Sequence, residues 1–238
     1  MTKPLFRDDA YLREASARVV DITGEGGIVL DGSIFYPTSG GQPGDSGQLS
    51  WAGARLEIAT AVKGEGDAII LLPAEPVPLP AVGQVVQQKL NWDRRHRHMR
   101  VHTALHLLSV VIPLPVTGGS IAADKGRLDF DMAEAPEDKE TLESDLNRLI
   151  ACNMQISTEW ITDAELDAQP DLVKTMSVQP PRGSGHIRLV RIGLGDETAD
   201  LQPCGGTHVA NTSEIGRVRI GKIEKKGRQN RRVYLHLE

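Results

Sequence analysis

The sequence changes character at DRRHRHMRVHTALHLLSVV, residues 93–111, where apolar side chains begin to recur at the spacing of an α-helix. The repeat consists of Met99, Val101, Leu105, Leu108 and Ile112. Pro113 and Pro115 end the predicted helix, because a proline inside a helix removes a hydrogen bond and clashes with the preceding turn. We place a domain boundary just before this segment, so that residues 1–90 form one domain and residues 91–238 form a second.

Residues 19–90 have the pattern of a small all-β unit. Short runs rich in Val, Ile and Leu alternate with glycine-containing turns, such as GEGG at residues 24–27 and GEGD at residues 64–67. Four prolines fall within PAEPVPLP, residues 73–80, which favours a surface connection over a central strand. We therefore expect short strands joined by tight turns in the first domain.

The second domain is expected to combine helices with an antiparallel sheet. A second helix is predicted over residues 136–152, because Pro136 and the acids after it suit a first turn, and Asp163 is predicted to cap a short helix. Strand patterns occur in QISTEWI, IRLVRI, GRVRIGKI and RRVYLHL, which begin at residues 155, 187, 216 and 231. Helices on one side of such a sheet make this domain α+β.

The composition excludes several protein classes. With 39% hydrophobic and 25% charged residues, the chain resembles an ordinary globular protein, and no apolar run approaches the roughly 20 residues of a membrane helix. The first residues, MTKPLFRDD, lack a signal-peptide pattern, so we expect a cytoplasmic protein. Only Cys152 and Cys204 could form a disulfide, which argues against a disulfide framework, and Cys152 is expected to be a small core residue.

Two half-sites for a metal ion occur about a hundred residues apart. HTALH places His102 and His106 on the same face of the predicted helix, although such a pair could equally be two histidines that only hydrogen-bond to their neighbours. QPCGGTHV, residues 202–209, places Cys204 and His208 around two glycines that suit a turn. The combined set of one Cys and three His favours zinc over magnesium or calcium.

The role of such a zinc ion stays open. Three protein ligands would leave a position for a reactive water, whereas four would close the site, so the ion could activate water, orient a substrate or only pin the loop to the helix. A zinc peptidase of the HExxH type is disfavoured, because Thr103 stands where its general-base glutamate would be.

A third segment, DGSIFYPTSGGQPGDSG at residues 31–47, is either a flexible connector or a ligand-binding loop. Its apolar IFY entry would anchor a defined loop, and its glycines would let a small ligand approach the backbone closely. The candidate ligand-binding residues are Thr38, Gly40, Gly41, Gln42 and Asp45.

In order, FYPTSGGQPGDSG, HTALH and CGGTH resemble motifs of the editing domain of alanyl-tRNA synthetase. Since no aminoacylation module precedes them, the chain is similar to the free-standing alanyl-tRNA editing proteins of the AlaX type. The resemblance covers about residues 19–237. It implies a β-barrel-like N-terminal domain that carries the glycine-rich motif, followed by a zinc-binding α+β editing domain of the kind shared with threonyl-tRNA synthetase.

The resemblance also implies roles for individual residues. According to the resemblance, four residues are the zinc ligands: His102, His106, Cys204 and His208. The two helix histidines would then belong to the catalytic centre, and Thr38 or Gln42 would contact the hydroxyl of serine, the group that alanine lacks.

A further segment, TGGSIAADKGRLDFDM at residues 117–132, resembles the family's segment that continues into the amino-acid pocket. This likeness makes Ser120, Arg127 and Asp129 candidate substrate-binding residues. The sequence departs from the family pattern at Leu128, where Phe is usual, and at Leu105, where the synthetases often have Thr.

Positive charge is concentrated despite the net charge of −5. It gathers in RRHRHMR, residues 94–100, and over residues 217–232, where eight Lys and Arg accompany a single acid. Such segments could follow a phosphate backbone, although any solvated hairpin could carry the same charges. The residues expected to contact tRNA are Arg95, Lys225, Lys226, Arg228 and Arg231.

The motifs together predict a zinc-dependent deacylase that acts in trans on Ser-tRNA(Ala), with Gly-tRNA(Ala) as a further possible substrate. Two alternatives stay open: a deacylase for a different mischarged tRNA, and a zinc-stabilised tRNA-binding module without turnover. The sequence does not set the oligomeric state.

Overall fold

The chain divides into two compact units, Met1–Arg97 and His98–Glu238. The computed structural model describes residues 1–136, 138–176 and 185–238. The boundary expected at residue 90 precedes helix α2 (Trp92–Val111), whose residues 92–97 belong to unit 1. Residue 137, which the predicted second helix included, lies outside the described residues.

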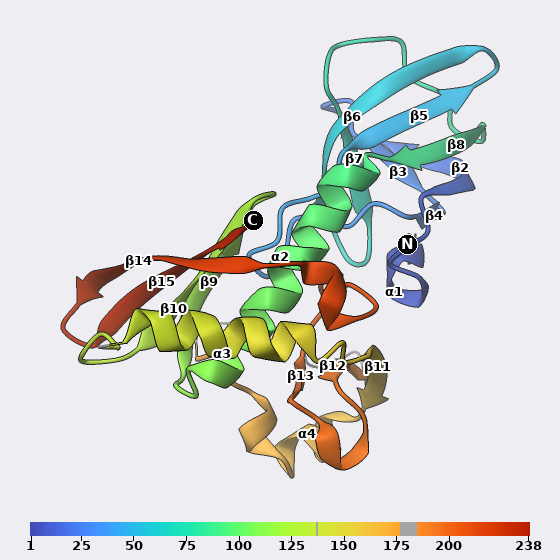
Figure 1. Ribbon diagram of the computed structural model, residues 1–238. Coiled ribbons are helices and arrows are strands. Elements are labelled where there is room, and N and C mark those ends of the chain that lie inside the picture. The colour runs from blue at the N-terminus through green and yellow to red at the C-terminus, as the bar shows by residue number, and fades with distance from the viewer. Residues whose placement is uncertain (137, 177–184) are drawn as a thin grey trace. The chain divides into compact units, whose positions relative to one another are not determined.

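Unit 1 is a closed barrel with the strand order β2-β3-β7-β6-β5-β8, and every neighbouring pair is antiparallel (Figure 1). The strands are β2 (Glu14–Ile22), β3 (Ile28–Leu30), β5 (Gly47–Trp51), β6 (Ala54–Lys63), β7 (Ile69–Pro73) and β8 (Val85–Leu90). Alternate side chains fill the interior, where Val19, Leu49 and Leu71 have no exposed surface. The barrel confirms the prediction of an all-β first domain.

Shorter elements complete unit 1. Strand β1 (Lys3–Pro4) pairs in parallel with β4 (Gly32–Ser33), and α1 (Leu5–Asp8) follows β1 directly. The proline-rich segment leaves β7 at Pro73 and reaches β8 through residues outside any strand, as expected for a surface connection. The sequence pattern did not predict strand β5, because Leu49 is its one fully buried position and polar Gln48 and Ser50 flank it.

The described residues of unit 2 form two antiparallel sheets, so the expectation of a single sheet was wrong. The four-stranded sheet has the order β14-β15-β10-β9 and consists of β9 (Val116–Ile121), β10 (Lys125–Asp131), β14 (Val218–Gly227) and β15 (Asn230–Leu237). The three-stranded sheet consists of β11 (Ile156–Ile161), β12 (Ile187–Ile192) and β13 (Asp200–Pro203). Strand patterns locate strands along the chain, but pairing between distant strands decides which sheet each one joins.

Helix α3 (Lys139–Ala151) packs against β14 in unit 2 (Figure 1). Asn147 fixes this contact, because its amide donates to the carbonyl of Val218 at 2.8 Å and accepts from the Val218 amide at 3.0 Å. The helix begins three residues later than predicted, since Asp138 is its N-cap and accepts from the Thr141 amide at 2.9 Å. Cys152 at the end of α3 is exposed, so the expectation of a core residue was wrong.

The remaining helices are short. Helix α4 (Asp163–Asp167) is capped by Thr162 and not, as expected, by Asp163, and Glu165 completes a capping box with that threonine. The 3-10 turns are η1 (Pro170–Leu172), η2 (Gly195–Glu197) and η3 (Thr212–Ile215). Among the described residues, no helix has both the length and the apolar character needed to cross a membrane.

Candidate metal centre

Helix α2 carries the first two candidate ligands. His102 and His106 are one helical turn apart and are both buried, at 8% and 7% exposure. The neighbouring Val101 and Leu105 contact the backbone of Gly126 closely enough that a Cβ there would lie 2.6 Å and 2.9 Å from their side chains. This packing on strand β10 fixes the rotation of the helix about its axis, and so the direction in which the histidines project.

The other two candidate ligands lie on the loop that follows β13. The side chain of Arg188, on the adjacent strand β12, holds this loop by donating from Nη1 to the carbonyls of Cys204 at 2.8 Å and Gly206 at 3.0 Å. The amide of Gly206 in turn points to the Cys204 sulfur, with 3.4 Å between nitrogen and Sγ. The chain turns back on itself in this loop, so that His208 returns to within 3.3 Å of the Cys204 sulfur.

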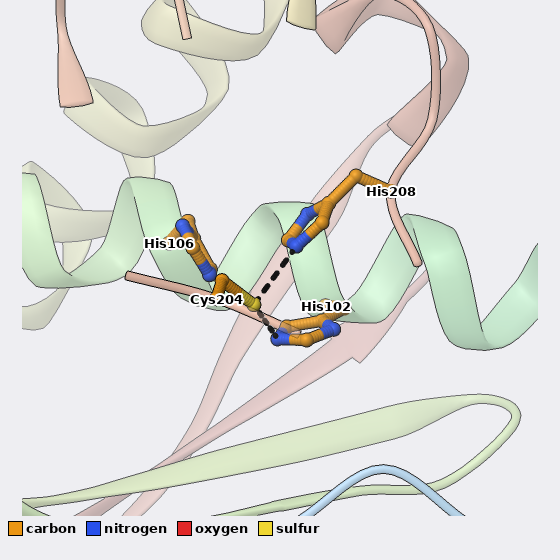
Figure 2. Close-up of side chains that lie close together, drawn as sticks. All are labelled: His102, His106, Cys204 and His208. Atoms are coloured by element: carbon orange, nitrogen blue, oxygen red, sulfur yellow. Dashed lines mark hydrogen bonds between the residues drawn. The ribbon is translucent and has the colours of Figure 1, made fainter. Parts of the chain in front are cut away.

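The four side chains converge, as Figure 2 shows. One ligand atom from each of His102, His106, Cys204 and His208 can be chosen so that all four lie within 4.8 Å of one another. Sγ of Cys204 lies 3.5 Å from Nε2 of His102 and 3.3 Å from Nε2 of His208. A tetrahedral zinc site separates a sulfur and a nitrogen ligand by roughly 3.5 Å, given its usual bond lengths. The cluster can therefore hold a metal ion, and its donor set and spacing suit zinc.

The electrostatics of the cluster favour metal ligation. Burial alone would raise the pKa of Cys204, but its charge and hydrogen-bond interactions with the surrounding imidazoles, those with His102 foremost, outweigh burial, so the pKa lies well below its usual value and the thiolate is favoured. Burial lowers the pKa of His208 to about 3, with His102 adding to the effect, so this imidazole is neutral. A thiolate and a neutral imidazole are the protonation states that bind zinc.

His106 differs from its neighbours because an acid lies behind it. Burial would lower its pKa, but the hydrogen bond to Asp200 dominates together with the thiolate of Cys204 and raises the pKa to about 9. Nδ1 of His106 lies 2.9 Å from Oδ2 of Asp200, which has 2% exposure. Asp200 was not among the expected site residues, because it stands 94 residues from His106 in the chain and belongs to no motif.

The chain is similar to known proteins along its whole length. Residues 187–234, which include both loop ligands, match the family described as Threonyl and Alanyl tRNA synthetase second additional domain. The alanyl-tRNA editing protein AlaX-M of Methanosarcina acetivorans is 36% identical over 100% of this chain and 99% of that protein. The chain belongs to the AlaX family of alanyl-tRNA editing proteins. The AlaX-M protein of Saccharolobus solfataricus is 33% identical over 98% of both chains. The alanine–tRNA ligase of Caldivirga maquilingensis is 30% identical over 94% of this chain, but the match covers only 25% of the ligase.

The glycine-rich loop of this AlaX chain contains a tight turn. Ser39 and Gln42 exchange backbone hydrogen bonds, and Gly40 and Gly41 between them have φ values of +55° and +81°. Two successive positive φ values are required in a type I′ turn, which accounts for this pair of glycines. Thr38 is exposed, but its hydroxyl already accepts from the Gly44 amide at 2.9 Å.

Gln42 and Asp45 lie inside this loop. Gln42 has no exposed surface, so its expected contact with a substrate does not fit the structure. Asp45 is 1% exposed, accepts from the amide of Tyr36 and forms an ion pair with Arg95, whose side chain is fully buried. Arg95 also donates to the carbonyls of Ala10 and Ile34. Asp45 and Arg95 therefore have a structural role in unit 1, which corrects their assignments to substrate and tRNA.

The expected pocket residues of unit 2 lie on β9 and β10. Leu128 and Phe130 of β10 are buried, so Arg127 and Asp129, at alternate positions, face the opposite side. Asp129 accepts from Arg127 at 2.6 Å and pairs with Arg232, and Ser120 is the cross-strand partner of Arg127. Helix α2 contacts β10 on the Gly126 side, so Ser120, Arg127 and Asp129 face away from the helix that carries two of the ligands. Their expected place in an amino-acid pocket beside the cluster does not fit this packing.

The expected tRNA-binding residues near the C-terminus lie on a hairpin formed by β14 and β15, as predicted. Lys225, Lys226 and Arg228 are exposed at its tip. Arg231 is 8% exposed and donates to the carbonyls of Gly227, Asn230 and Ala133. Its role is therefore to hold the turn together, which corrects the expectation for this residue.

Proposed function

We propose that the chain is a zinc-dependent hydrolase that removes serine from mischarged Ser-tRNA(Ala) in trans. The observation that carries the proposal is the convergence of His102, His106, Cys204 and His208 in one cluster, in which the three histidines are buried and Cys204 is half-buried. Membership of the alanyl-tRNA editing family supports the tRNA substrate, because relatives that match along their whole length are named for alanyl-tRNA editing.

The reaction is the hydrolysis of an ester. Water adds to the carbonyl carbon of the aminoacyl group, the bond to the ribose oxygen breaks, and that oxygen takes up a proton, which yields free serine and intact tRNA. When bound, zinc would supply a Lewis acid at the ligand cluster. The chain's contribution is to hold two of the four candidate ligands in their binding forms: the lowered pKa of Cys204 favours its thiolate, and that of His208 its neutral imidazole.

Discrimination between serine and alanine is proposed to depend on a hydrogen bond to the serine hydroxyl. Thr38 is the candidate, because it is exposed and its oxygen, which accepts from the Gly44 amide at 2.9 Å, keeps a further lone pair. A site with a polar group aimed at a hydroxyl rejects a substrate that lacks one, since the group is left unpaired. Thr38→Val is therefore expected to slow serine release more than Thr38→Ser, which retains the hydroxyl.

The tRNA backbone is proposed to contact the tip of the β14–β15 hairpin. Lys225, Lys226 and Arg228 are exposed there, and lysine and arginine contacts to phosphate give affinity without base identity. Replacement of all three by Gln is expected to weaken tRNA binding and to flatten its dependence on salt concentration.

The test of the proposal follows release of labelled amino acid from Ser-tRNA(Ala), Gly-tRNA(Ala) and Ala-tRNA(Ala) by the zinc-loaded protein. Cys204→Ala is compared with Cys152→Ala, which removes a thiol from an exposed position at the end of α3. We expect wild type and Cys152→Ala to release serine, Cys204→Ala to lose the activity, and alanine to stay on its tRNA.

Two results would overturn the proposal. Tight binding of tRNA without release of any amino acid would indicate a zinc-stabilised binding module. Release of a different amino acid, with Ser-tRNA(Ala) untouched, would indicate a deacylase for another mischarged tRNA.

A further inference from the structure

Polar side chains that were not among the expected site residues contact the candidate ligands His106 and His208 on the side away from the cluster. Asp200, on β13, is 2% exposed and makes three contacts. Its Oδ2 lies 2.9 Å from Nδ1 of His106 and accepts from Nε2 of Gln202 at 2.8 Å, and its Oδ1 pairs with Nζ of Lys174 at 2.6 Å. The carboxylate is thus held on both oxygens and cannot turn away from the histidine without losing another partner.

Thr103 contacts Nδ1 of His208, as Asp200 contacts Nδ1 of His106. This side chain has no exposed surface, and its hydroxyl donates to the carbonyl of Met99 at 2.9 Å, one turn back along α2. The hydroxyl proton is therefore committed, so the oxygen can only accept from Nδ1 of His208, which lies 3.1 Å away. The same oxygen accepts from the amide of Val209 at 3.3 Å.

Both contacts decide which ring nitrogen carries the proton. An imidazole whose Nδ1–H donates to a fixed acceptor has its Nε2 lone pair free on the opposite side of the ring. In His208 that nitrogen faces the Cys204 sulfur at 3.3 Å. The acceptors thus select the tautomer and the ring orientation that a ligand to a shared ion needs.

The charge balance around Asp200 supports its role in orienting His106. A buried carboxylate is costly unless it is paired, and Lys174, whose side chain is 28% exposed, supplies the opposite charge. The pair lets a full negative charge lie behind His106, where it strengthens the basicity of the ring toward a cation on the far side.

We propose that Asp200, held by Lys174, and Thr103 are positioning residues that set the metal affinity of the cluster through His106 and His208. The proposal rests on zinc binding as part of the proposed function. It assigns a role to the residue between the two histidines of HTALH, where a zinc peptidase would have its glutamate. In this chain that position, Thr103, orients a ligand from the rear.

The test measures zinc affinity by competition with a chromophoric chelator, together with the visible spectrum of the cobalt-substituted protein. The variants are Asp200→Asn, Thr103→Val, Thr103→Ser and Lys174→Met. The matched controls are Asp145→Asn, which removes an acid paired with Arg148 on the surface of α3, and Thr158→Val, at an exposed position of β11. Circular dichroism and unfolding temperature report whether each variant is folded.

We expect Asp200→Asn and Thr103→Val to weaken zinc binding roughly 10- to 100-fold and to alter the cobalt spectrum. Thr103→Ser should restore both properties, because it keeps the accepting hydroxyl, and both controls should match wild type. Lys174→Met, at a partly exposed position, should weaken zinc binding in the same direction even if Asp200→Asn does not fold.

The outcomes separate the two proposals. If wild type binds zinc tightly and the folded Asp200, Thr103 and Lys174 variants bind it equally well, the positioning roles are wrong while the metal site stands. If the variants lower only the unfolding temperature, with affinity and spectrum unchanged, these residues serve folding alone and the proposal is likewise overturned. Failure of wild type to bind zinc would overturn the metal site itself.

Discussion

At Arg95, a guanidinium is enclosed within the barrel unit. Its side chain is fully buried and contacts the carboxylate of Asp45 and the carbonyls of Ala10 and Ile34. The sequence RRHRHMR suggests a basic surface, yet one face of the helix turns this residue inward, because helix periodicity places only some positions of a run toward solvent. The ion pair joins the glycine-rich loop to the first turn of α2.

Arg95→Met is expected to destabilise the protein by about 3–5 kcal/mol, because it leaves Asp45 buried without its counter-charge. Lys89→Met is the control, since Lys89 pairs with Glu14 at a surface where both side chains are more than half exposed, and its loss should cost under about 1 kcal/mol. Urea unfolding measures both. Equal stabilities of the two variants would show that the buried pair does not stabilise the fold.

Asp129 offers a test by pH. Burial would raise the pKa of Asp129, but hydrogen bonds from Arg232 and Arg127 outweigh it and the pKa is lowered. A lowered pKa means that the stabilising contribution is complete above the usual aspartate value of about 4 and is lost as the pH falls through the folded-state value. Asp129→Asn should therefore lower the unfolding temperature at pH 7, by less than Arg95→Met does.

The effect of the same substitution should shrink as the pH falls below about 4, because the wild-type carboxylate takes up a proton as the pH passes through its lowered folded-state pKa. Thermal unfolding of wild type and Asp129→Asn across this pH range measures the difference. A difference that stays constant from pH 7 to pH 2 would contradict the ionic origin of the stabilisation.

Among the secondary-structure elements, α2 and β10 depend on close packing at one glycine. A Cβ on Gly126 would lie 2.6 Å from Cγ1 of Val101 and 2.9 Å from Cδ1 of Leu105. The glycine therefore lets the helix approach the sheet, and this approach aligns the two helix histidines with the loop ligands.

Gly126→Ala is expected to destabilise unit 2 by about 1–3 kcal/mol, because the added methyl group overpacks the contact. Gly118→Ala on the neighbouring strand is the control, since its Cβ would meet Asp129 at an ordinary 3.5 Å. Chemical unfolding compares the two, and zinc affinity should also fall in Gly126→Ala. A stability equal to that of Gly118→Ala would contradict this account of the packing.

The positions of helices and strands were predicted correctly where a short segment of sequence carries the pattern. The apolar repeat in residues 93–111 predicted α2, and the strand patterns that begin at residues 216 and 231 predicted the two strands that form the β14–β15 hairpin. The start of α3 was placed three residues early, because Pro136 suits a first turn but the side chain of Asp138 makes the cap. The division of unit 2 into two sheets was missed, since period-two alternation carries no information about which distant strand becomes a partner.

At the scale of the whole molecule, the ligand cluster ties two distant parts of unit 2 together. Helix α2 supplies two of the candidate ligands and the loop after β13 supplies the other two. Ions that bind only the folded state stabilise it, by about 2.7 kcal/mol when free metal is 100 times the dissociation constant. The effect should be confined to the unit that holds the ligands.

Removal of zinc by a chelator is therefore expected to speed amide hydrogen exchange around residues 102–106 and 204–208, while exchange in barrel strands β5 to β8 stays unchanged. Mass spectrometry of exchanged peptides measures this, with the Cys204→Ala protein as a control that should not respond to the chelator. A uniform change across both units would contradict a local role of the metal.

The sequence by itself determined the candidate ligand set, helix α2, the all-β character of the first unit and the two strands of the C-terminal hairpin. Each of these depends on spacing within a short segment, which the local geometry of helices, strands and turns converts directly into direction. Only the tertiary structure decided that Arg95 and Arg231 are buried, that Arg127 and Asp129 face away from α2, and that Asp200 stands behind His106. These facts depend on contacts between residues far apart in the chain, and periodicity and motif spacing do not encode such contacts.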